Sequence, residues 1–411
     1  MTNTVATGLQ YVDADGHVLE PPTGLQDFAD EDFRSRVWHV EVDDDGVEWV
    51  VAEGNRLRAN VFSLAGAAGF TEDDKQKALE GAFAYGEVSR RSWDPKLRLE
   101  CMDTDGIGVA VLYPTQFLAI QAWPDLDYAV RSCRAYNDWL SDHCAQSGGR
   151  LFGVAVLPQQ DPEASAAELR RVADLPAMVG GFLRPNPTAG WKHFHDEVYD
   201  PIWQAARDTD LAVGFHPYLD AMLPGAAQGL RVSKLGMDTP LRATMPDEVG
   251  SAIPGLPTGM DNMAFSQAIA NPVDMMTTIT FMTMGGVCER FPGVRFVFLE
   301  ANGGWIVPWL ERLDHHAHEF PWDMPNLSMT PSAYFRRQCY ISFDVDEAAL
   351  NLAATSPLCG ADRIVWASDF PHPDAKYPGV TEALNDATAT LDDDARALIA
   401  GGNALHLYGL A

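Results

Sequence analysis

Eight short apolar segments recur along this chain, and the intervals between them are long enough to hold a helix. The segments span residues 11–15, 108–113, 152–157, 179–183, 211–216, 294–299, 339–343 and 363–368. Stretches with apolar residues near a 3.6-residue period lie between them, at 129–145, 162–173, 201–209, 272–290 and 305–319. Short apolar runs that alternate with helices are typical of a parallel sheet covered by helices. The chain is therefore predicted to have an α/β fold.

Eight strand–helix repeats favour a closed (β/α)8 barrel of the TIM type. A doubly wound open sheet is the alternative, but no G-x-G-x-x-G fingerprint follows the first strand. Because such barrels hold about 250 residues or more in one unit, we expect residues 1–411 to form a single domain.

Two segments exceed what a minimal barrel needs. Residues 31–100 include VWHVEVDDDGVEWVVAEG, where alternating apolar residues flank an Asp-Asp-Gly turn, so a β-hairpin is expected at the barrel mouth or an edge. Residues 218–272, after the fifth strand, are rich in Gly, Pro and Met and predict a cover segment. Nine of the 14 methionines lie between positions 222 and 284, where they either mould to an apolar ligand or fill the core.

The net charge limits the kinds of molecule that the protein is expected to bind, and the cysteine spacing indicates the state of the thiols. With 29 Lys and Arg against 58 Asp and Glu, the formal charge is −29, which disfavours nucleic acid and anionic lipid surfaces. Without a signal peptide pattern or a spanning apolar stretch, we expect a cytoplasmic protein with no membrane partner. The six cysteines are widely spaced and are expected to be reduced and buried. A small-molecule substrate is the expected partner.

Ionisable side chains occur at the ends of four of the predicted strands, and the packing of an apolar core does not require them there. The first strand leads into Asp15 and His17, the fifth into His216, the sixth into Glu300 and the eighth into Asp369. In a barrel these strand ends meet at one mouth. Three carboxylates brought that close raise one another's pKa unless a cation neutralises them. Two imidazoles with several carboxylates suit Zn, Mn or Fe better than Mg or Ca.

Alternation along the first strand points Asp13, Asp15 and His17 to one side, so Asp15 and His17 can hold one ion from a single strand end. The alternative is that Asp15 caps a loop and His17 packs in the core. Both interpretations remain open on these residues alone.

Six motifs in order resemble the amidohydrolase-related family of metal-dependent TIM-barrel hydrolases and decarboxylases. They are YVDADGHVLEP, LRPNP, GFH, FLEANGGWIVPWLERLD, ASDFPHPD and GGNALHLYGL. The resemblance implies metal ligands at Asp15, His17, His216 and Asp369. Many members have a His-x-His pair on the first strand, and Asp15 in place of a histidine favours Mn or Fe over Zn. Glu300 stands where many relatives have a histidine that acts as acid, base or ligand.

Other polar residues near the predicted mouth have two interpretations each. Arg184, after the fourth strand, either binds a substrate carboxylate or pairs with a surplus acid. His372 either orients a water or substrate or supports Asp369. Asp344 is a candidate for the mouth, and Asp346 is expected to cap a helix.

The main functional prediction is a metal-dependent hydrolase or non-oxidative decarboxylase that acts on a bulky, partly apolar molecule with a carbonyl or carboxylate. Asp369, Glu300 and His372 are the candidate catalytic groups, Arg184 the candidate substrate-binding group, and Glu300 a further candidate metal ligand.

The alternative prediction is a non-heme diiron oxygenase, or monooxygenase, on the same barrel. Its second ion would need ligands among Glu20, Glu300, His315 and His372. His316 and His318 are expected on the surface. A metal-free scaffold is the third possibility, and association into a homo-oligomer is expected only by analogy with other barrels.

Overall fold

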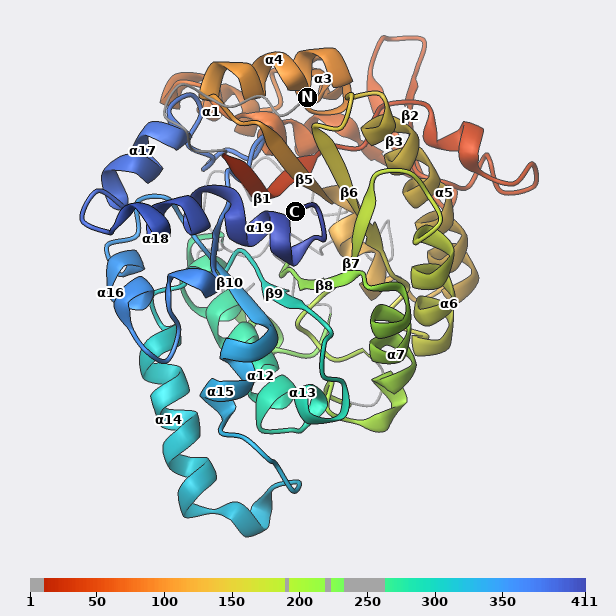
Figure 1. Cartoon of the computed structure of the whole chain (residues 1–411). Helices are drawn as coiled ribbons and strands as arrows, with labels where there is room; N and C mark the ends of the chain where they lie inside the picture. Colours follow the sequence, from red (N-terminus) through yellow and green to blue (C-terminus); the bar gives the residue numbers. More distant parts are fainter. Residues whose placement is uncertain (1–10, 189–191, 219–222, 233–262) are drawn as a thin grey trace.

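The computed structural model describes residues 11–188, 192–218, 223–232 and 263–411. Its main sheet has eight parallel strands in the order β1-β5-β6-β7-β8-β9-β10-β11, surrounded by helices (Figure 1). The strands are β1 (Val12–Val18), β5 (Val109–Pro114), β6 (Leu151–Val156), β7 (Met178–Leu183), β8 (Ala212–Phe215), β9 (Phe296–Phe298), β10 (Cys339–Phe343) and β11 (Ile364–Trp366).

This architecture confirms the predicted (β/α)8 barrel, and each predicted strand overlaps an observed one. Each strand follows its predecessor around the sheet, as helical crossovers between parallel neighbours require. The last strand reaches the first through the amide of Asp369, which donates to the carbonyl of Asp15 (3.2 Å), and the amide of His17, which donates to the carbonyl of Phe370 (2.8 Å). The barrel is nearly closed.

Helices follow the strands where capping residues start them. Asp94 and Asp161 each precede a proline at the first helical turn and accept backbone N–H groups through their side chains. Asp125 likewise accepts the amide of Tyr128 at 3.1 Å. The helices of the barrel are α4 (Pro95–Asp105), α5 (Leu126–Ala145), α6 (Pro162–Val172), α7 (Asp200–Thr209), α12 (Asn271–Thr283), α13 (Val287–Arg290), α14 (Ile306–Glu319), α15 (Pro331–Gln338), α16 (Leu350–Thr355), α17 (Val380–Ala387), α18 (Asp393–Ala397) and α19 (Asn403–Leu407).

The helix predicted over 272–290 is two helices. A turn separates α12 from α13, and Gly286 adopts a φ of 85°, a left-handed conformation that glycine accommodates without a steric penalty. Apolar periodicity continues across the break, which is why the sequence pattern did not reveal it.

The first insertion forms a three-stranded antiparallel sheet of β2 (His39–Val42), β3 (Glu48–Ala52) and β4 (Asn55–Arg58). The β2–β3 hairpin was predicted; β4 was missed because NRLR is too polar to mark a strand. The signal for it is the two-residue turn at Glu53 and Gly54, which both have positive φ. Short helices complete the insertion, namely α1 (Glu72–Leu79), α2 (Tyr85–Val88) and α3 (Arg90–Trp93).

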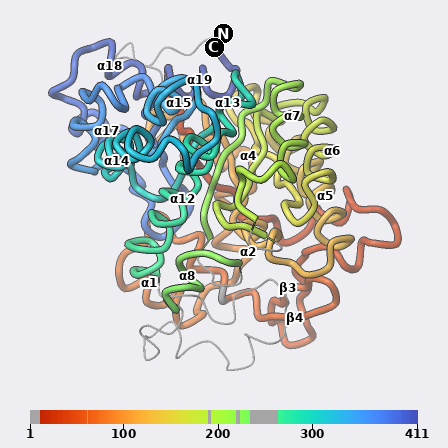
Figure 2. Tube along the Cα trace, turned by 90° about the horizontal axis from the view of Figure 1, so that it is seen from below, coloured from red at the N-terminus to blue at the C-terminus, as the bar shows by residue number. Residues whose placement is uncertain are grey.

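The insertion lies at the barrel mouth, which is one of the two places expected for it. The amide of Val40 donates to the carbonyl of Pro22 (2.7 Å), which follows β1, and the indole N–H of Trp123 donates to Glu53 (2.6 Å). Figure 2 shows β3, β4 and α1 at one end of the molecule, with the C-terminus at the other.

Most of the predicted cover segment, 218–272, lies outside the described residues. Its described parts include α8 (Ala226–Gly229) and α11 (Met263–Phe265), and α8 lies at the same end of the molecule as β3 and β4 (Figure 2). Of the clustered methionines, Met275 and Met282 are buried in the core, as the gap-filling interpretation expects.

The described helices include none with the length and apolar character needed to cross a bilayer. All six cysteines are free and buried.

Candidate metal centre at the barrel mouth

The ionisable residues predicted at the strand ends do meet at the mouth of the barrel. Asp15 and His17 come from β1, His216 directly follows β8, Glu300 follows β9, and Asp369 follows β11. We call these five residues the ligand cluster. His17 and His216 are fully buried, whereas Glu300 and Asp369 keep about a fifth of their side chains exposed, at 21% and 23%.

The two imidazoles of the cluster are held with the same nitrogen facing inward. Nδ1 of His17 lies 2.7 Å from the carbonyl oxygen of Pro114, and Nδ1 of His216 lies 2.8 Å from that of Pro217. A carbonyl only accepts, so each Nδ1 carries a hydrogen, and in the neutral ring the lone pair is on Nε2. The two Nε2 atoms face each other at 3.2 Å.

The carboxylates surround these nitrogens. Nε2 of His17 lies 3.7 Å from Oδ1 of Asp15 and 3.4 Å from Oδ1 of Asp369. Nε2 of His216 lies 3.7 Å from Oδ2 of Asp15 and 3.0 Å from Oε2 of Glu300. Oδ1 of Asp15 is buried and has no hydrogen-bond partner. A buried carboxylate oxygen without a donor is costly, so the cluster lacks positive charge.

The excess of negative charge raises the affinity of the cluster for protons. Burial raises the pKa of Asp15 well above its usual range, and Glu300 and Asp369 raise it further. Burial, with Glu300 among the neighbouring acids, also raises the pKa of Asp369 well above its usual range. Although burial opposes the charged ring, Asp15 and Glu300 raise the pKa of His216. The cluster therefore binds protons where a cation would displace them.

The donor set fits a divalent transition metal. Ligand atoms about 2.0–2.2 Å from one ion lie about 3–3.5 Å from each other, which is close to the separations in the cluster. Asp15, His17 and His216 form one group whose ligand atoms all lie within 4.8 Å of one another, and His17, Asp369 and His372 form another. Two imidazoles with carboxylates match Mn, Fe or Zn.

Backbone strain accompanies the cluster at two strand ends. Glu300 has a φ of 45° and Asp369 a φ of 53°, both in the left-handed region that side chains other than glycine seldom adopt. Asn302 has a φ of 52° in the same loop as Glu300. Such conformations concentrate at functional sites, where the fold holds them in place.

His372 lies against the cluster and links it to β5. Its Nδ1 is 2.7 Å from Oδ1 of Asp369, its Nε2 is 3.1 Å from Oγ1 of Thr115, and its ring centroid is 4.2 Å from that of His17. Burial lowers its pKa. Thr115 was not singled out from the sequence, because a threonine after a strand carries no distinctive signal.

A pocket opens beside the cluster and encloses about 760 Å³ of space, part of it continuous with solvent. Asp15, Glu300 and Asp369 line it, which places three of the five cluster residues at the wall of a pocket that a small molecule can enter from solvent. Its other described lining residues are Gln267, Asn302, Ser342, Asp344, Val345, Asp346, Ala367, Ser368, Asp374, Ala375, Lys376 and Val380.

The sequence predictions for three acidic residues of this pocket had different outcomes. Asp344 lines the mouth as predicted, and burial, with the neighbouring Glu347, raises its pKa to about 6. Asp346 was expected to cap a helix, but α16 begins only at Leu350, and Asp346 instead pairs with Lys376 at 3.1 Å. Asp374 was missed although it closes the ASDFPHPD motif.

Asp13 was expected on the same side of the strand as Asp15 and His17. In the structure it instead accepts hydrogen bonds from Ser368. A register shift between Asp13 and Gly16 interrupts the alternation of β1. The carboxylate of Asp13 accepts the amide (2.9 Å) and the hydroxyl (2.6 Å) of Ser368.

Glu20 was a candidate ligand for a second ion, but its carboxylate is occupied. It is fully buried and accepts the amides of Thr115, Gln116 and Phe117 at 2.9–3.3 Å. Burial raises its pKa to about 7. The sequence alone does not separate this structural role from a metal-binding one, because both place a carboxylate after β1.

Arg184 and the histidines of α14 are not part of the ligand cluster. Arg184 directly follows β7, is 1% exposed, and donates to Oδ1 of Asn186 at 3.3 Å. It is not among the described residues that line the pocket. The histidines of α14, at 315, 316 and 318, lie on the C-terminal half of that helix, with 315 and 318 exposed.

Two curated relatives match most of this chain. A 2-amino-3-carboxymuconate-6-semialdehyde decarboxylase of Dictyostelium discoideum is 24% identical over 337 residues, 81% of each chain. A gamma-resorcylate decarboxylase of Rhodococcus jostii is 27% identical over 326 residues, 73% of this chain and 84% of that protein.

A 5-carboxyvanillate decarboxylase of Novosphingobium aromaticivorans, solved with bound manganese and 3-methoxy-4-hydroxy-5-nitrobenzoic acid, superposes with a TM-score of 0.63. It is 19% identical and the match covers 98% of both chains, which supports the fold. The amidohydrolase family model matches residues 12–410. This chain therefore belongs to the amidohydrolase family.

Proposed function

We propose that the protein is a metal-dependent, non-oxidative decarboxylase of an aromatic carboxylic acid. The observation that carries this proposal is the pair of inward-facing Nε2 atoms, 3.2 Å apart and surrounded by carboxylates, at the mouth of the barrel. Relatives that match most of the chain are named decarboxylases, which favours decarboxylation over hydrolysis. A diiron oxygenase is not proposed, because Glu20 is engaged by three backbone amides.

One divalent ion, with manganese as the favoured metal, would be held by Asp15, His17, His216 and Asp369. The presence of manganese in a structural neighbour and the carboxylate-rich donor set support this choice. When bound, the ion supplies positive charge that orients the substrate carboxylate and withdraws electron density from it.

Decarboxylation exchanges the carboxylate carbon for a proton, so an acid must face the ring carbon that loses CO2. Glu300 is the proposed proton donor, because it lines the pocket and lies beside His216. His372 is proposed to hold Asp369 in place through its Nδ1, with Thr115 fixing the other ring nitrogen. Asp369 is proposed both as a metal ligand and as a group that exchanges the proton with Glu300.

A substrate panel tests this function directly. Purified protein loaded with manganese is incubated with hydroxy-, amino- and methoxy-substituted benzoic acids, and CO2 and the decarboxylated ring are quantified together. We expect release of one CO2 per ring product, and loss of turnover after chelation of the metal. Hydrolysis of matched esters or amides by protein that leaves every carboxylate intact would contradict the proposal.

Arg184 is proposed to bind the substrate carboxylate or an adjacent anionic group. It lies at the C-terminal end of β7, the end of the barrel that carries the ligand cluster, and its guanidinium carbon is 5.6 Å from the ring centroid of Tyr218. Replacing Arg184 with alanine is expected to raise KM by about 10- to 100-fold, because a charge-assisted hydrogen bond contributes about 1.5–3 kcal/mol.

Steady-state kinetics of Arg184→Ala and Arg184→Lys check this role. The lysine variant keeps the charge and is expected to restore part of the affinity. Arg207→Ala, on the exposed face of α7, serves as a control for loss of a positive charge elsewhere. An unchanged KM in Arg184→Ala would remove the role in substrate binding.

A further inference from the structure

The seam between the last and the first strand of the barrel carries three of the proposed metal ligands. Asp15 and His17 lie on β1, and Asp369 follows β11. The described ladders join neighbouring strands from β1 round to β11, and the seam itself is closed by individual hydrogen bonds. The relative position of these ligands therefore depends on few contacts.

Arg98, from α4, makes two of those contacts. Its Nη1 donates to the carbonyl of His17 (3.2 Å) and to that of Phe370 (3.1 Å), one on each side of the seam. The carbonyl of Phe370 also accepts the amide of His17 at 2.8 Å. One guanidinium thus ties the ligand His17 to the residue that follows the ligand Asp369.

The surroundings of Arg98 are built to keep the guanidinium there. The side chain is 1% exposed, and its guanidinium carbon lies 4.5 Å from the ring centroid of Phe370. The buried carboxylate of Asp13, fixed by Ser368, supplies the counter-charge. A counter-ion and two carbonyl acceptors restrict the geometry of this buried arginine.

Gly16 makes room for this contact between the two ligands of β1. A Cβ at position 16 would stand 2.7 Å from Nη2 of Arg98 and 2.7 Å from Oδ2 of Asp13. The guanidinium therefore lies against the backbone at the point where the register of β1 shifts.

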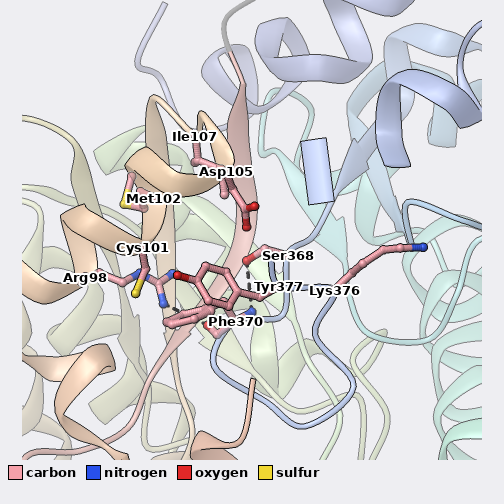
Figure 3. A pocket seen from close by; sticks show the side chains of 9 residues that line it. All are labelled: Arg98, Cys101, Met102, Asp105, Ile107, Ser368, Phe370, Lys376 and Tyr377. Carbon is pink, nitrogen blue, oxygen red and sulfur yellow. Dashed lines mark hydrogen bonds between the residues drawn. The ribbon is translucent and has the colours of Figure 1, made fainter. Parts of the chain in front are cut away.

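Arg98 is not among the described residues that line the pocket beside the ligand cluster. It lines a different, small pocket together with Ser368, Phe370 and Tyr377 (Figure 3). Its effect on the reaction must therefore act through the ligands.

We propose that Arg98 is a positioning residue that closes the barrel seam and thereby sets the spacing of Asp15, His17 and Asp369 around the metal. This inference rests on the proposed metal centre. Loss of partners that orient metal ligands typically weakens metal binding by about 10- to 100-fold.

Manganese affinity of the metal-free protein, measured by calorimetry, tests the role of Arg98. Arg98→Met is expected to raise the Mn²⁺ Kd by about 10- to 100-fold, and Arg98→Lys to restore part of it. Arg150→Met is the matched control, because Arg150 also donates to backbone carbonyls, those of Gly108 (3.0 Å) and Ile107 (2.7 Å), ahead of β5. The control is expected to lower the unfolding temperature and leave the Mn²⁺ Kd unchanged.

A folded Arg98→Met protein whose Mn²⁺ Kd stays within about twofold of the original would overturn the proposal. If Arg98→Met does not fold, Gly16→Ala decides, since the added methyl group crowds the guanidinium and the Asp13 carboxylate that supplies its counter-charge while Arg98 remains. An unchanged Kd in Gly16→Ala would then overturn it, and a raised Kd would support it. Failure of the unmodified protein to bind Mn²⁺ would instead contradict the metal centre itself.

Discussion

Replacing His216 with alanine is expected to abolish divalent-metal binding and decarboxylation together. His216 is fully buried, and its Nε2 lies within 3.0–3.7 Å of Glu300, His17 and Asp15. Without this imidazole, the remaining ligands hold an ion through fewer bonds in a site that still concentrates negative charge. We expect the Mn²⁺ Kd to rise by more than about 100-fold and turnover to fall by at least about 1000-fold.

Metal content after dialysis and CO2 release, measured on the same preparation, check this expectation. His318→Ala, on the exposed end of α14, is the matched control and is expected to change neither quantity. Circular dichroism establishes that the His216 variant keeps its secondary structure. A folded His216→Ala protein with full metal content would remove His216 from the ligand set.

Replacing Glu300 with glutamine is expected to lower kcat by about 100- to 10,000-fold while Mn²⁺ affinity changes by less than about tenfold. Among the described residues, Glu300 belongs to neither group of three whose ligand atoms lie within 4.8 Å of one another. Its position beside His216 and on the pocket wall suits proton transfer better than coordination. Glutamine keeps the shape and the hydrogen bonding of the side chain but has no carboxyl proton to donate.

The pH profile and the metal affinity of Glu300→Gln separate the two predicted roles of this residue. Loss of one ionisation from the kcat profile, with the Mn²⁺ Kd nearly unchanged, is the expected result. Glu319→Gln, at the exposed end of α14, is the control. A large rise in the Mn²⁺ Kd with kcat preserved at saturating metal would contradict the proposed acid and assign Glu300 to the ligand set.

The barrel was predictable from sequence because its signals are local and repeated. Most of the parallel strands are largely apolar runs, such as residues 339–343, which match β10 at both ends. The ligand cluster was predictable for a related reason. Ionisable residues directly after apolar strands do not contribute to core packing. Because the C-terminal ends of all strands lie at one mouth of a barrel, such residues are expected to lie close together.

Contacts between distant segments were not predictable in the same way. Arg98 meets His17 and Phe370 across separations of 81 and 272 residues, and no local pattern indicates such a contact. Glu20 was mistaken for a possible metal ligand because its partners, the amides of residues 115–117, are backbone groups that carry no sequence signal. Strand β4 was missed because packing of an insertion tolerates polar residues that a central strand would not.

The most direct test of the metal centre is the stoichiometry and location of bound manganese. Protein stripped of metal and titrated with Mn²⁺ is predicted to bind about one ion per chain, and anomalous diffraction is predicted to place it between Nε2 of His17 and Nε2 of His216 with Asp15 and Asp369 in contact. An ion located elsewhere, or no binding at millimolar Mn²⁺ by a folded protein, would contradict the account.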